Sequence, residues 1–240
     1  LTNSVFDIII TELLTFLRAN RININGKDEL TILDDDGNFF LVSIDPKKDD
    51  LQELKILTEN FEESYALGRI TDVDVFDDNA RPISSGKGKK CIICDDRPAV
   101  QCMREKNHTY DDLRSIMFNL IGNYLDDYNT KKVKNLLSSI ATKALLYEVS
   151  LSPKPGLVDF NDSGSHIDMN YFSFLNSISA LSVYWKDFAE SGLSFKGDLS
   201  NALPLIRNIG LKAEETMFKQ TNGVNTQKGL IFLLGLSVFS

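Results

Sequence analysis

Two aspartates separated by a single residue, Asp72 and Asp74, are the first group in the sequence that could do chemistry. They lie in a stretch of alternating polar and apolar residues, 69–76, which predicts a β-strand. Successive side chains of a strand point to opposite faces, so both carboxylates would leave the same face, about 7 Å apart along the backbone. Such a pair can hold a Mg²⁺ ion that also binds substrate phosphates. A solvent-exposed edge strand explains the same pattern without a metal.

Three cysteines and a histidine form the second group: Cys91, Cys94, Cys102 and His108. Thiolate and imidazole ligands suit Zn²⁺, which takes four of them in a structural site. The spacing differs from the common zinc-finger patterns, so free cysteines beside a surface histidine are the alternative interpretation. Four protein ligands leave no open coordination position, so a zinc ion here would stabilise a loop rather than catalyse.

A loop rich in proline and glycine forms the third group, because Pro153, Pro155 and Gly156 exclude a continuous helix. Between two expected helices, this loop displays four polar functional residues: Lys154, Asp159, His166 and Asp168. The N-terminus of the following helix offers free N–H groups and the positive end of the helix dipole, which suit phosphate. An acid at such a place is usually a helix cap, which is the simpler interpretation of Asp168.

The fourth group lies in residues 214–229. Asn222 and Gly223 are expected to end one helix, and the next begins after Asn225 and Thr226, with Lys228 in its first turn. A lysine in a first turn is unfavourable to the helix dipole, which favours an anion bound beside it. The Walker spacing for phosphate is not present, and a plain turn between helices is the alternative.

Charge and periodicity both change near Tyr128. Residues 1–128 contain 25 acidic and 15 basic side chains, whereas residues 129–240 contain 9 and 11. The first part contains two helical patterns, at 5–17 and 50–64. It also contains three strand patterns, at 30–33, 39–44 and 69–76, and the first two of these flank a turn signal at 34–38. From Tyr110 onward the patterns are helical only: 110–128, 131–149, 168–189, 201–219 and 228–240. We expect an α+β fold of two domains, an α/β unit over 1–128 followed by an all-α unit over 129–240.

Composition restricts the class of protein. The 240 residues are 42% hydrophobic and 25% charged, which is typical of a globular chain. A net charge of -8 and a pI near 4.9 weigh against general nucleic-acid or anionic-membrane binding, and the longest apolar run, 230–239, is too short to span a bilayer. An odd number of cysteines favours a reducing compartment, so we expect a cytoplasmic protein. Helical patterns that stop uncapped at both ends suggest a chain truncated from something longer.

Three motifs, in this order, resemble the triphosphoribosyl-dephospho-CoA synthase family: Pro153-Lys-Pro-Gly-Leu-Val-Asp159, Gly164-x-His166-x-Asp168-Met169 and Gly223-Val-Asn-Thr-x-Lys-Gly229. The first unit resembles another enzyme family, holo-citrate lyase synthase, in Leu67-Gly-Arg-Ile-Thr-Asp-Val-Asp-Val75 and in Cys91-Ile-Ile-Cys-Asp, followed by Cys102-Met-Arg and His108. The two enzymes are known as a bifunctional fusion in this order. The resemblance covers the C-terminal part of the first enzyme, over 1–128, and the N-terminal part of the second, over 129–240.

The resemblance implies a transferase that makes and attaches the prosthetic group of citrate lyase. The synthase half would join ATP to dephospho-CoA and release adenine. The other half, a nucleotidyltransferase-like unit, would transfer the product to a serine of the citrate lyase acyl carrier protein and release pyrophosphate. An inactive fragment, or a zinc-stabilised module that binds the acyl carrier protein, is the alternative.

Roles for individual residues follow from this implied chemistry. Adenine leaves through an oxocarbenium-like state, so Asp159 and Asp168 are candidates for the stabilising carboxylate and the general base, with His166 as proton carrier. The nucleotide would be bound by five further residues of the second unit: Lys154, Gly156, Asn225, Thr226 and Lys228. Asp72 and Asp74 would hold Mg²⁺ in the transferase half. Where the synthase family usually has histidine this chain has Gln227, which weakens any acid–base role at that position.

Overall fold

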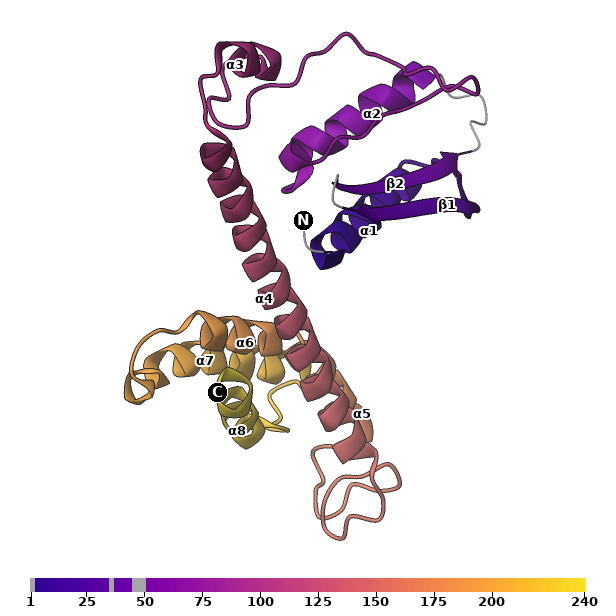
Figure 1. Ribbon diagram of the computed structural model, residues 1–240. Coiled ribbons are helices and arrows are strands. Elements are labelled where there is room, and N and C mark those ends of the chain that lie inside the picture. The colour runs from indigo at the N-terminus through magenta and orange to yellow at the C-terminus, as the bar shows by residue number, and fades with distance from the viewer. Residues whose placement is uncertain (1–2, 35–36, 45–50) are drawn as a thin grey trace. The chain divides into compact units, whose positions relative to one another are not determined.

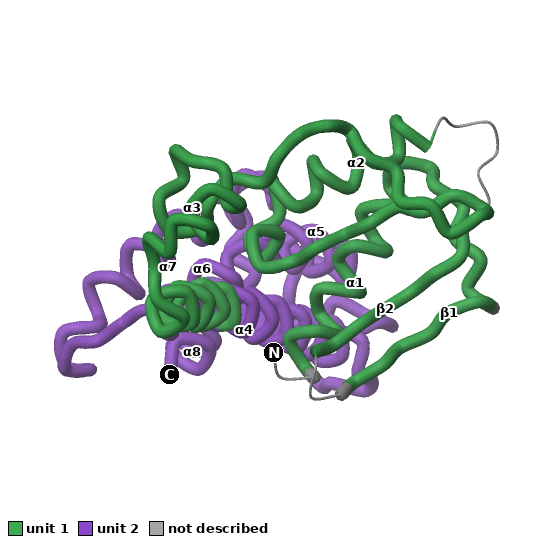
Figure 2. Tube along the Cα trace, turned by 45° about the horizontal axis from the view of Figure 1, so that its top comes forward, with its two compact units in different colours: residues 1–125 green, residues 126–240 purple. Residues whose placement is uncertain are grey.

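The computed structural model describes residues 3–34, 37–44 and 51–240. The chain divides into two compact units, residues 1–125 and 126–240 (Figure 2). The described part of the first unit contains both helices and strands, and the second unit contains helices only (Figure 1). The mixed α+β class expected from the sequence is therefore confirmed.

The described elements of the first unit are, in order, α1 (Asn3–Ala19), β1 (Ile24–Asp34), β2 (Gly37–Ile44), α2 (Leu51–Ser64), the 3-10 turn η1 (Gly68–Ile70) and the short helix α3 (Ala99–Glu105). The elements η1 and α3 were not expected from the sequence. The expected helices at 5–17 and 50–64 and the strands at 30–33 and 39–44 are confirmed. Asp35 and Asp36 of the hairpin turn, and Asp50, lie outside the described residues.

The strands β1 and β2 form an antiparallel two-stranded sheet, with Leu30 opposite Leu41 and Ile32 opposite Phe39. A two-stranded hairpin is marginal by itself in water. Here α1 packs against it, and a small core that includes Leu17 of α1 and Leu54 of α2 joins these elements. This core positions α2, which forms one side of the first candidate site.

The strand expected at 69–76 is wrong. The chain turns tightly after α2, where a side chain at Gly68 would overlap the backbone of Glu62, and η1 forms in that turn. Residues 71–75 carry no strand assignment, and a single β-bridge joins Phe76 to Pro82. The alternation of faces survives nevertheless, because Val75 is buried while Asp72 and Asp74 are exposed.

From Tyr110 onward the helix boundaries differ from those expected. Residues 110–128 and 131–149 belong to one helix, α4 (Tyr110–Ser150), since neither proline nor glycine separates the two segments. The helix expected at 168–189 begins later and divides into α5 (Tyr171–Leu181) and α6 (Tyr184–Ser194). At the break, Ser182 Oγ donates to the carbonyl of Ser179, a local hydrogen bond that competes with helix geometry. The turn η2 (Leu199–Asn201) and helices α7 (Leu203–Gln220) and α8 (Lys228–Phe239) follow.

The core of the second unit is formed where α6 and α7 pack against α8. Trp185 and Phe188 of α6 are completely buried. Gly192 of α6 lies directly against the backbone of Phe239, and the Phe188 ring covers Gly235 of α8. Small residues therefore allow these helices to approach closely.

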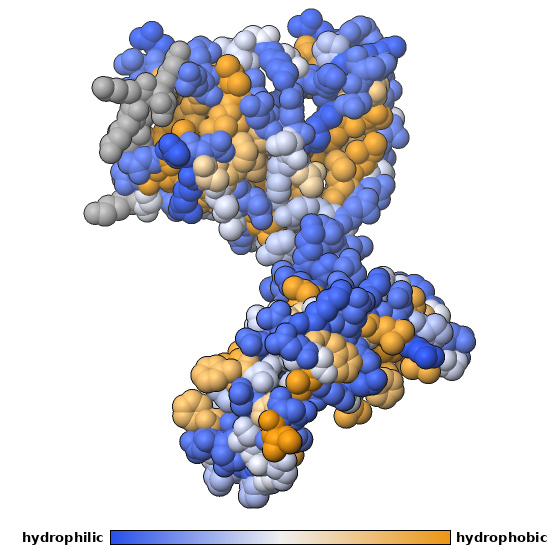
Figure 3. Space-filling model, turned by 180° about the vertical axis from the view of Figure 1, so that it is seen from behind, coloured by the Kyte–Doolittle hydropathy of each residue, from blue (hydrophilic) through white to orange (hydrophobic). Residues whose placement is uncertain are grey.

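Apolar side chains are also exposed on both units, as the orange surfaces in Figure 3 show. They include Phe39 and Leu41 on the hairpin and Phe232 and Leu233 on α8, each about half exposed or more. Within the described residues, none of the helices combines the length and the apolar character needed to cross a membrane.

Replacing Gly192 by alanine should destabilise the second unit by about 1–3 kcal/mol, because the added methyl group meets backbone that cannot move away alone. Urea unfolding followed by the fluorescence of Trp185, the chain's one tryptophan, measures this. Gly229→Ala is the matched control: its added methyl group meets open space, and alanine favours the helix. Equal stability of the two variants would contradict the proposed close packing.

Candidate functional site

A pocket of about 610 Å³ lies in the first unit, between α2, residues 68–74 and residues 82–95. Both Asp72 and Asp74 line it. The lining is strongly charged, with six acidic and five basic side chains. Such a pocket suits a ligand that carries phosphates and a divalent cation.

Each of the two aspartates is paired with a lysine. Asp72 Oδ1 lies 2.6 Å from Lys89 Nζ, and Asp74 Oδ1 lies 3.5 Å from Lys55 Nζ. Lys55 also donates a hydrogen bond to the carbonyl of Val73 at 2.9 Å. The two carboxylates offer the oxygen ligands that Mg²⁺ prefers and face the pocket, so they fit the expected metal. The structure places them there without the predicted strand.

Sequence reasoning missed Glu62, a third acid of this pocket. Its side chain is buried, accepts the N–H of Val73 at 2.6 Å and pairs with Lys89 Nζ at 3.0 Å. Burial alone would lower the pKa of Lys89, but the hydrogen bonds to Asp72 and Glu62 outweigh it and raise that pKa. A signal was present in the sequence: Lys55 and Glu62 are seven residues apart on α2 and share its buried face.

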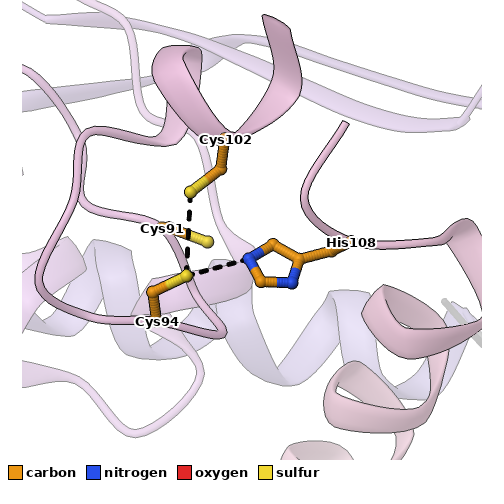
Figure 4. Close-up of side chains that lie close together, drawn as sticks. All are labelled: Cys91, Cys94, Cys102 and His108. Carbon is orange, nitrogen blue, oxygen red and sulfur yellow. Dashed lines mark hydrogen bonds between the residues drawn. The ribbon is translucent and has the colours of Figure 1, made fainter. Parts of the chain in front are cut away.

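The structure brings together all four residues of the cysteine–histidine group. One ligand atom from each of Cys91, Cys94, Cys102 and His108 lies within 4.8 Å of the others (Figure 4). The sulfurs of Cys94 and Cys102 are 3.7 Å apart, and His108 Nε2 lies 2.9 Å from the Cys94 sulfur. Two sulfurs bound to one tetrahedral zinc are about 3.8 Å apart, so the first distance already suits zinc. In the part of the chain that the structure describes, this is the only such group of candidate ligands.

The thiols of this group differ in acidity. Burial raises the pKa of Cys91, but N–H donors of Cys94 and Ile93 and the two neighbouring thiols outweigh it and lower that pKa to about 7. Burial and the neighbouring thiols of Cys102 and Cys91 raise the pKa of Cys94 to about 11. A bound cation would favour the thiolate of both residues.

Short local structures hold the four ligands. The helix α3 carries Cys102 and ends at Lys106, which has left-handed backbone geometry. His108 directly precedes a reciprocal cap at the start of α4, in which Thr109 Oγ1 accepts the N–H of Asp112, and Asp112 accepts the N–H of Thr109. Arg69 from the pocket side donates to the carbonyl of Cys91 at 3.0 Å and pairs with Asp95 at 2.7 Å. Arg69 thereby joins the loop that carries Cys91 and Cys94 to the pocket that contains Asp72 and Asp74.

In the second unit, Asp159 organises the loop between α4 and α5. It is only 3% exposed. Its carboxylate accepts four hydrogen bonds, from the Ser152 hydroxyl and the N–H groups of Lys154, Asn161 and Asp162, at 2.7–3.0 Å. The N–H groups of Asp162 and Lys154, followed by the Ser152 hydroxyl, hold the pKa of this carboxyl well below its usual range. Asp159 is thus a fixed anion at the centre of the loop.

Two glycines determine the path of the same loop. Gly156 and Gly164 both have positive φ, and a side chain at Gly164 would overlap the backbone of Gly156 and Leu157. The two arms of the loop are also joined by a hydrogen bond from the N–H of Ser165 to the carbonyl of Gly156, at 3.2 Å. The loop therefore folds back on itself.

The other polar residues of the loop lie in different surroundings. His166 and Asp168 are exposed, whereas the Lys154 side chain is mostly buried, and its ammonium group pairs with Glu148 at 2.8 Å. Asp168 is not the helix cap: Asn170 caps α5 in a reciprocal arrangement with Ser173. The simpler interpretation of Asp168 as a capping acid is therefore wrong.

The segment before α8 carries the remaining predicted residues. Asn225 Oδ1 accepts the N–H of Lys228 at 3.2 Å, and Lys228 Nζ pairs with Glu214 at 2.6 Å. The hydroxyl oxygen of Thr226 is buried, with no hydrogen-bond partner among the residues described. Gln227 is buried as well and accepts a hydrogen bond from the Ser177 hydroxyl at 2.8 Å. The Gln227 side chain is therefore part of the buried interior, where its hydrogen bond to Ser177 accommodates a glutamine.

Comparison with known proteins places two family models along this chain. Residues 1–124 match the apo-citrate lyase phosphoribosyl-dephospho-CoA transferase family, and residues 134–240 match the ATP:dephospho-CoA triphosphoribosyl transferase family. No solved structure matches the chain significantly.

Curated relatives follow the same division. Protein CitXG of Leuconostoc mesenteroides subsp. cremoris is 38% identical over 200 residues, which is 78% of this chain and 42% of that protein. A probable 2-(5''-triphosphoribosyl)-3'-dephosphocoenzyme-A synthase of Streptococcus pyogenes serotype M5 is 49% identical over 108 residues, 45% of this chain and 37% of that protein. The S. pyogenes serotype M49 protein has the same identity and coverage. The chain spans less than half the length of these relatives.

Asp159→Asn should lower the stability of the second unit most at neutral pH. The pKa of Asp159 is lower in the folded state than in the unfolded state. The ionised carboxylate therefore stabilises the folded state above about pH 4, and this stabilisation is lost as the pH falls through the folded-state pKa. Urea midpoints from Trp185 fluorescence should therefore differ strongly at pH 7 and converge below pH 4. A difference that is constant over this range would contradict the argument.

Proposed function

Because the chain belongs to the apo-citrate lyase phosphoribosyl-dephospho-CoA transferase family and continues into a triphosphoribosyl transferase region, we propose that it makes and attaches the prosthetic group of citrate lyase. The observation that carries the proposal is the presence of both regions, consecutively, in one chain. The same observation favours an enzyme over the alternative of a simple binding module. ATP and dephospho-CoA are the proposed substrates, and the acyl carrier protein of citrate lyase is the proposed partner.

The second unit would carry out the synthase step. The 2′-hydroxyl of dephospho-CoA attacks the ribose C1′ of ATP, the bond from C1′ to adenine breaks, and the hydroxyl proton passes to a base. Asp168 and His166, both exposed, are the candidates for proton transfer and for stabilising positive charge on the ribose. Asp159, with four hydrogen bonds already formed, fits a role in holding the loop that presents them.

The triphosphate passes intact into the product, so the second unit has to bind it without cleaving it. Lys154 and Lys228 are the proposed cations, together with the backbone around Gly156 and the polar side chains Asn225 and Thr226. The Thr226 hydroxyl supports this assignment, because it is buried without a partner among the described residues, and a buried hydroxyl normally forms a hydrogen bond.

The first unit would carry out the transfer. The hydroxyl of the carrier-protein serine attacks the phosphorus next to the ribosyl group, the bond to pyrophosphate breaks, and the serine proton is released. Asp72 and Asp74 would hold Mg²⁺, which when bound neutralises charge on the phosphates. Lys89 and Arg69 in the same pocket supply further positive charge toward the leaving pyrophosphate.

The cysteine–histidine group would bind a structural Zn²⁺. Three sulfurs and one imidazole nitrogen within 4.8 Å of one another satisfy the ligand number and type of such a site. All three cysteines are free thiols, in keeping with a cytoplasmic protein.

Incubation with ATP, Mg²⁺ and dephospho-CoA should release adenine, detected by chromatography, only when dephospho-CoA is present. Asp168→Asn should slow the release by about 100-fold or more, because a proton-transferring group is lost. Asp187→Asn, an exposed acid in the first turn of α6, is the control and should release adenine normally. Normal release by Asp168→Asn would remove that residue from the mechanism. A folded, zinc-loaded protein without turnover would favour the binding module.

Zinc analysis of the purified protein should find one ion per chain. The chain has two histidines, which provide a matched pair of variants. His108→Ala should weaken zinc binding more than about tenfold in competition with a chromogenic chelator, since one ligand of four is lost. His166→Ala should leave zinc affinity unchanged. Equal effects of the two substitutions, or a protein free of zinc, would contradict a structural zinc site.

A further inference from the structure

The charged pocket of the first unit is called the transferase pocket below. In it, the Lys89 ammonium group lies where a divalent cation would compete with it for the Asp72 carboxylate. Lys89 Nζ is 2.6 Å from Asp72 Oδ1, 3.0 Å from Glu62 Oε2 and 3.4 Å from the carbonyl of Thr71. It therefore neutralises one of the two aspartates proposed to hold Mg²⁺, together with the buried Glu62. Two cations so close to the same carboxylate would repel each other.

The lysine beside the other aspartate is bound differently. The Lys55 side chain is only 9% exposed, donates to the Val73 carbonyl at 2.9 Å and lies 3.5 Å from Asp74. Moving the Lys55 ammonium group would break its hydrogen bond to Val73 and its pairing with Asp74. The Lys89 side chain is 49% exposed, and solvent can accommodate its ammonium group in more than one position.

The backbone of Lys89 is fixed even though its ammonium group is accessible. Its carbonyl accepts the N–H of Ala99 at 2.8 Å, and the next residue, Lys90, forms a β-bridge with Pro98. Cys91 of the proposed zinc site follows directly. Lys89 is therefore a long, flexible side chain attached to a fixed point on the pocket wall.

For this pocket to bind a polyphosphate, some of its basic side chains have to move from the carboxylates to the phosphates. Six carboxylates would repel a polyphosphate, and the five basic side chains are already close to them. A bound polyphosphate brings negative charge, and its divalent cation brings positive charge to the carboxylates. Both are accommodated when an ammonium group moves from a carboxylate to a phosphate oxygen.

We propose that Lys89 is an exchangeable counter-cation of the transferase site: it pairs with Asp72 and Glu62 when no substrate is bound, and moves to the polyphosphate when the divalent cation binds Asp72. The proposal rests on the proposed transfer reaction. It assigns Lys89 to substrate binding and makes it a competitor of the metal when the metal is alone. These two roles predict opposite effects of one substitution.

The test is binding of Mn²⁺, a paramagnetic substitute for Mg²⁺, by electron paramagnetic resonance, with and without inorganic triphosphate. Lys89→Gln should bind Mn²⁺ alone about two- to fivefold more tightly, since a competing cation is lost. It should bind triphosphate in the presence of Mn²⁺ about tenfold more weakly, since a charge-assisted contact is lost. Unchanged far-ultraviolet circular dichroism would show that the variant is folded.

Lys87→Gln is the control for binding of Mn²⁺ alone, because Lys87 pairs with Glu63 at 2.5 Å and not with Asp72. It should leave that affinity unchanged. The inference is overturned if Lys89→Gln does not tighten Mn²⁺ binding while Asp72→Asn still abolishes it, an outcome that leaves the proposed function standing. Failure of the wild-type protein to bind Mn²⁺ and triphosphate at all would overturn both.

Discussion

Carboxylates that accept backbone N–H groups hold both candidate sites in shape. In the first unit Glu62 accepts the N–H of Val73 and thereby attaches residues 71–75 to α2, although this segment joins no sheet. In the second unit Asp159 accepts three N–H groups and a hydroxyl and organises the loop before α5. Ionised acceptors form strong hydrogen bonds, so one side chain can order several residues of irregular backbone.

This arrangement separates residues that shape a site from those available for chemistry. Glu62 and Asp159 are buried, with their oxygens engaged, whereas Asp72, Asp74 and Asp168 are exposed. Buried carboxylates keep a fixed geometry, and exposed ones can exchange partners at little cost. The same distinction applies to the basic residues of the charged pocket in the first unit, where the Lys55 side chain is buried and that of Lys89 is half exposed.

In the cysteine–histidine group, coordination of a metal ion would take the place of these hydrogen bonds. Its ligands come from a loop, from α3 and from the residue before the cap of α4, none of which has a large core of its own. A metal ion would join these short elements. Because Lys89 and Lys90 directly precede Cys91, and Arg69 donates a hydrogen bond to the carbonyl of Cys91, the same ion would fix one wall of the charged pocket in the first unit.

The sequence by itself determined the helices α1 and α2, the hairpin, the all-helical second half and the four residues of the cysteine–histidine group, because periodicity and ligand type are local properties. It failed at 69–76, where a strand pattern meets a turn enforced by close packing at Gly68. The alternative interpretation of Asp168 as a helix cap was also wrong, since the cap is Asn170, two residues further on. Tertiary structure alone decided that Glu62 and Lys89 join Asp72, and that Gln227 pairs with Ser177 inside the core. Those pairings join residues distant in sequence, and only the packing of the folded chain brings them within hydrogen-bonding range.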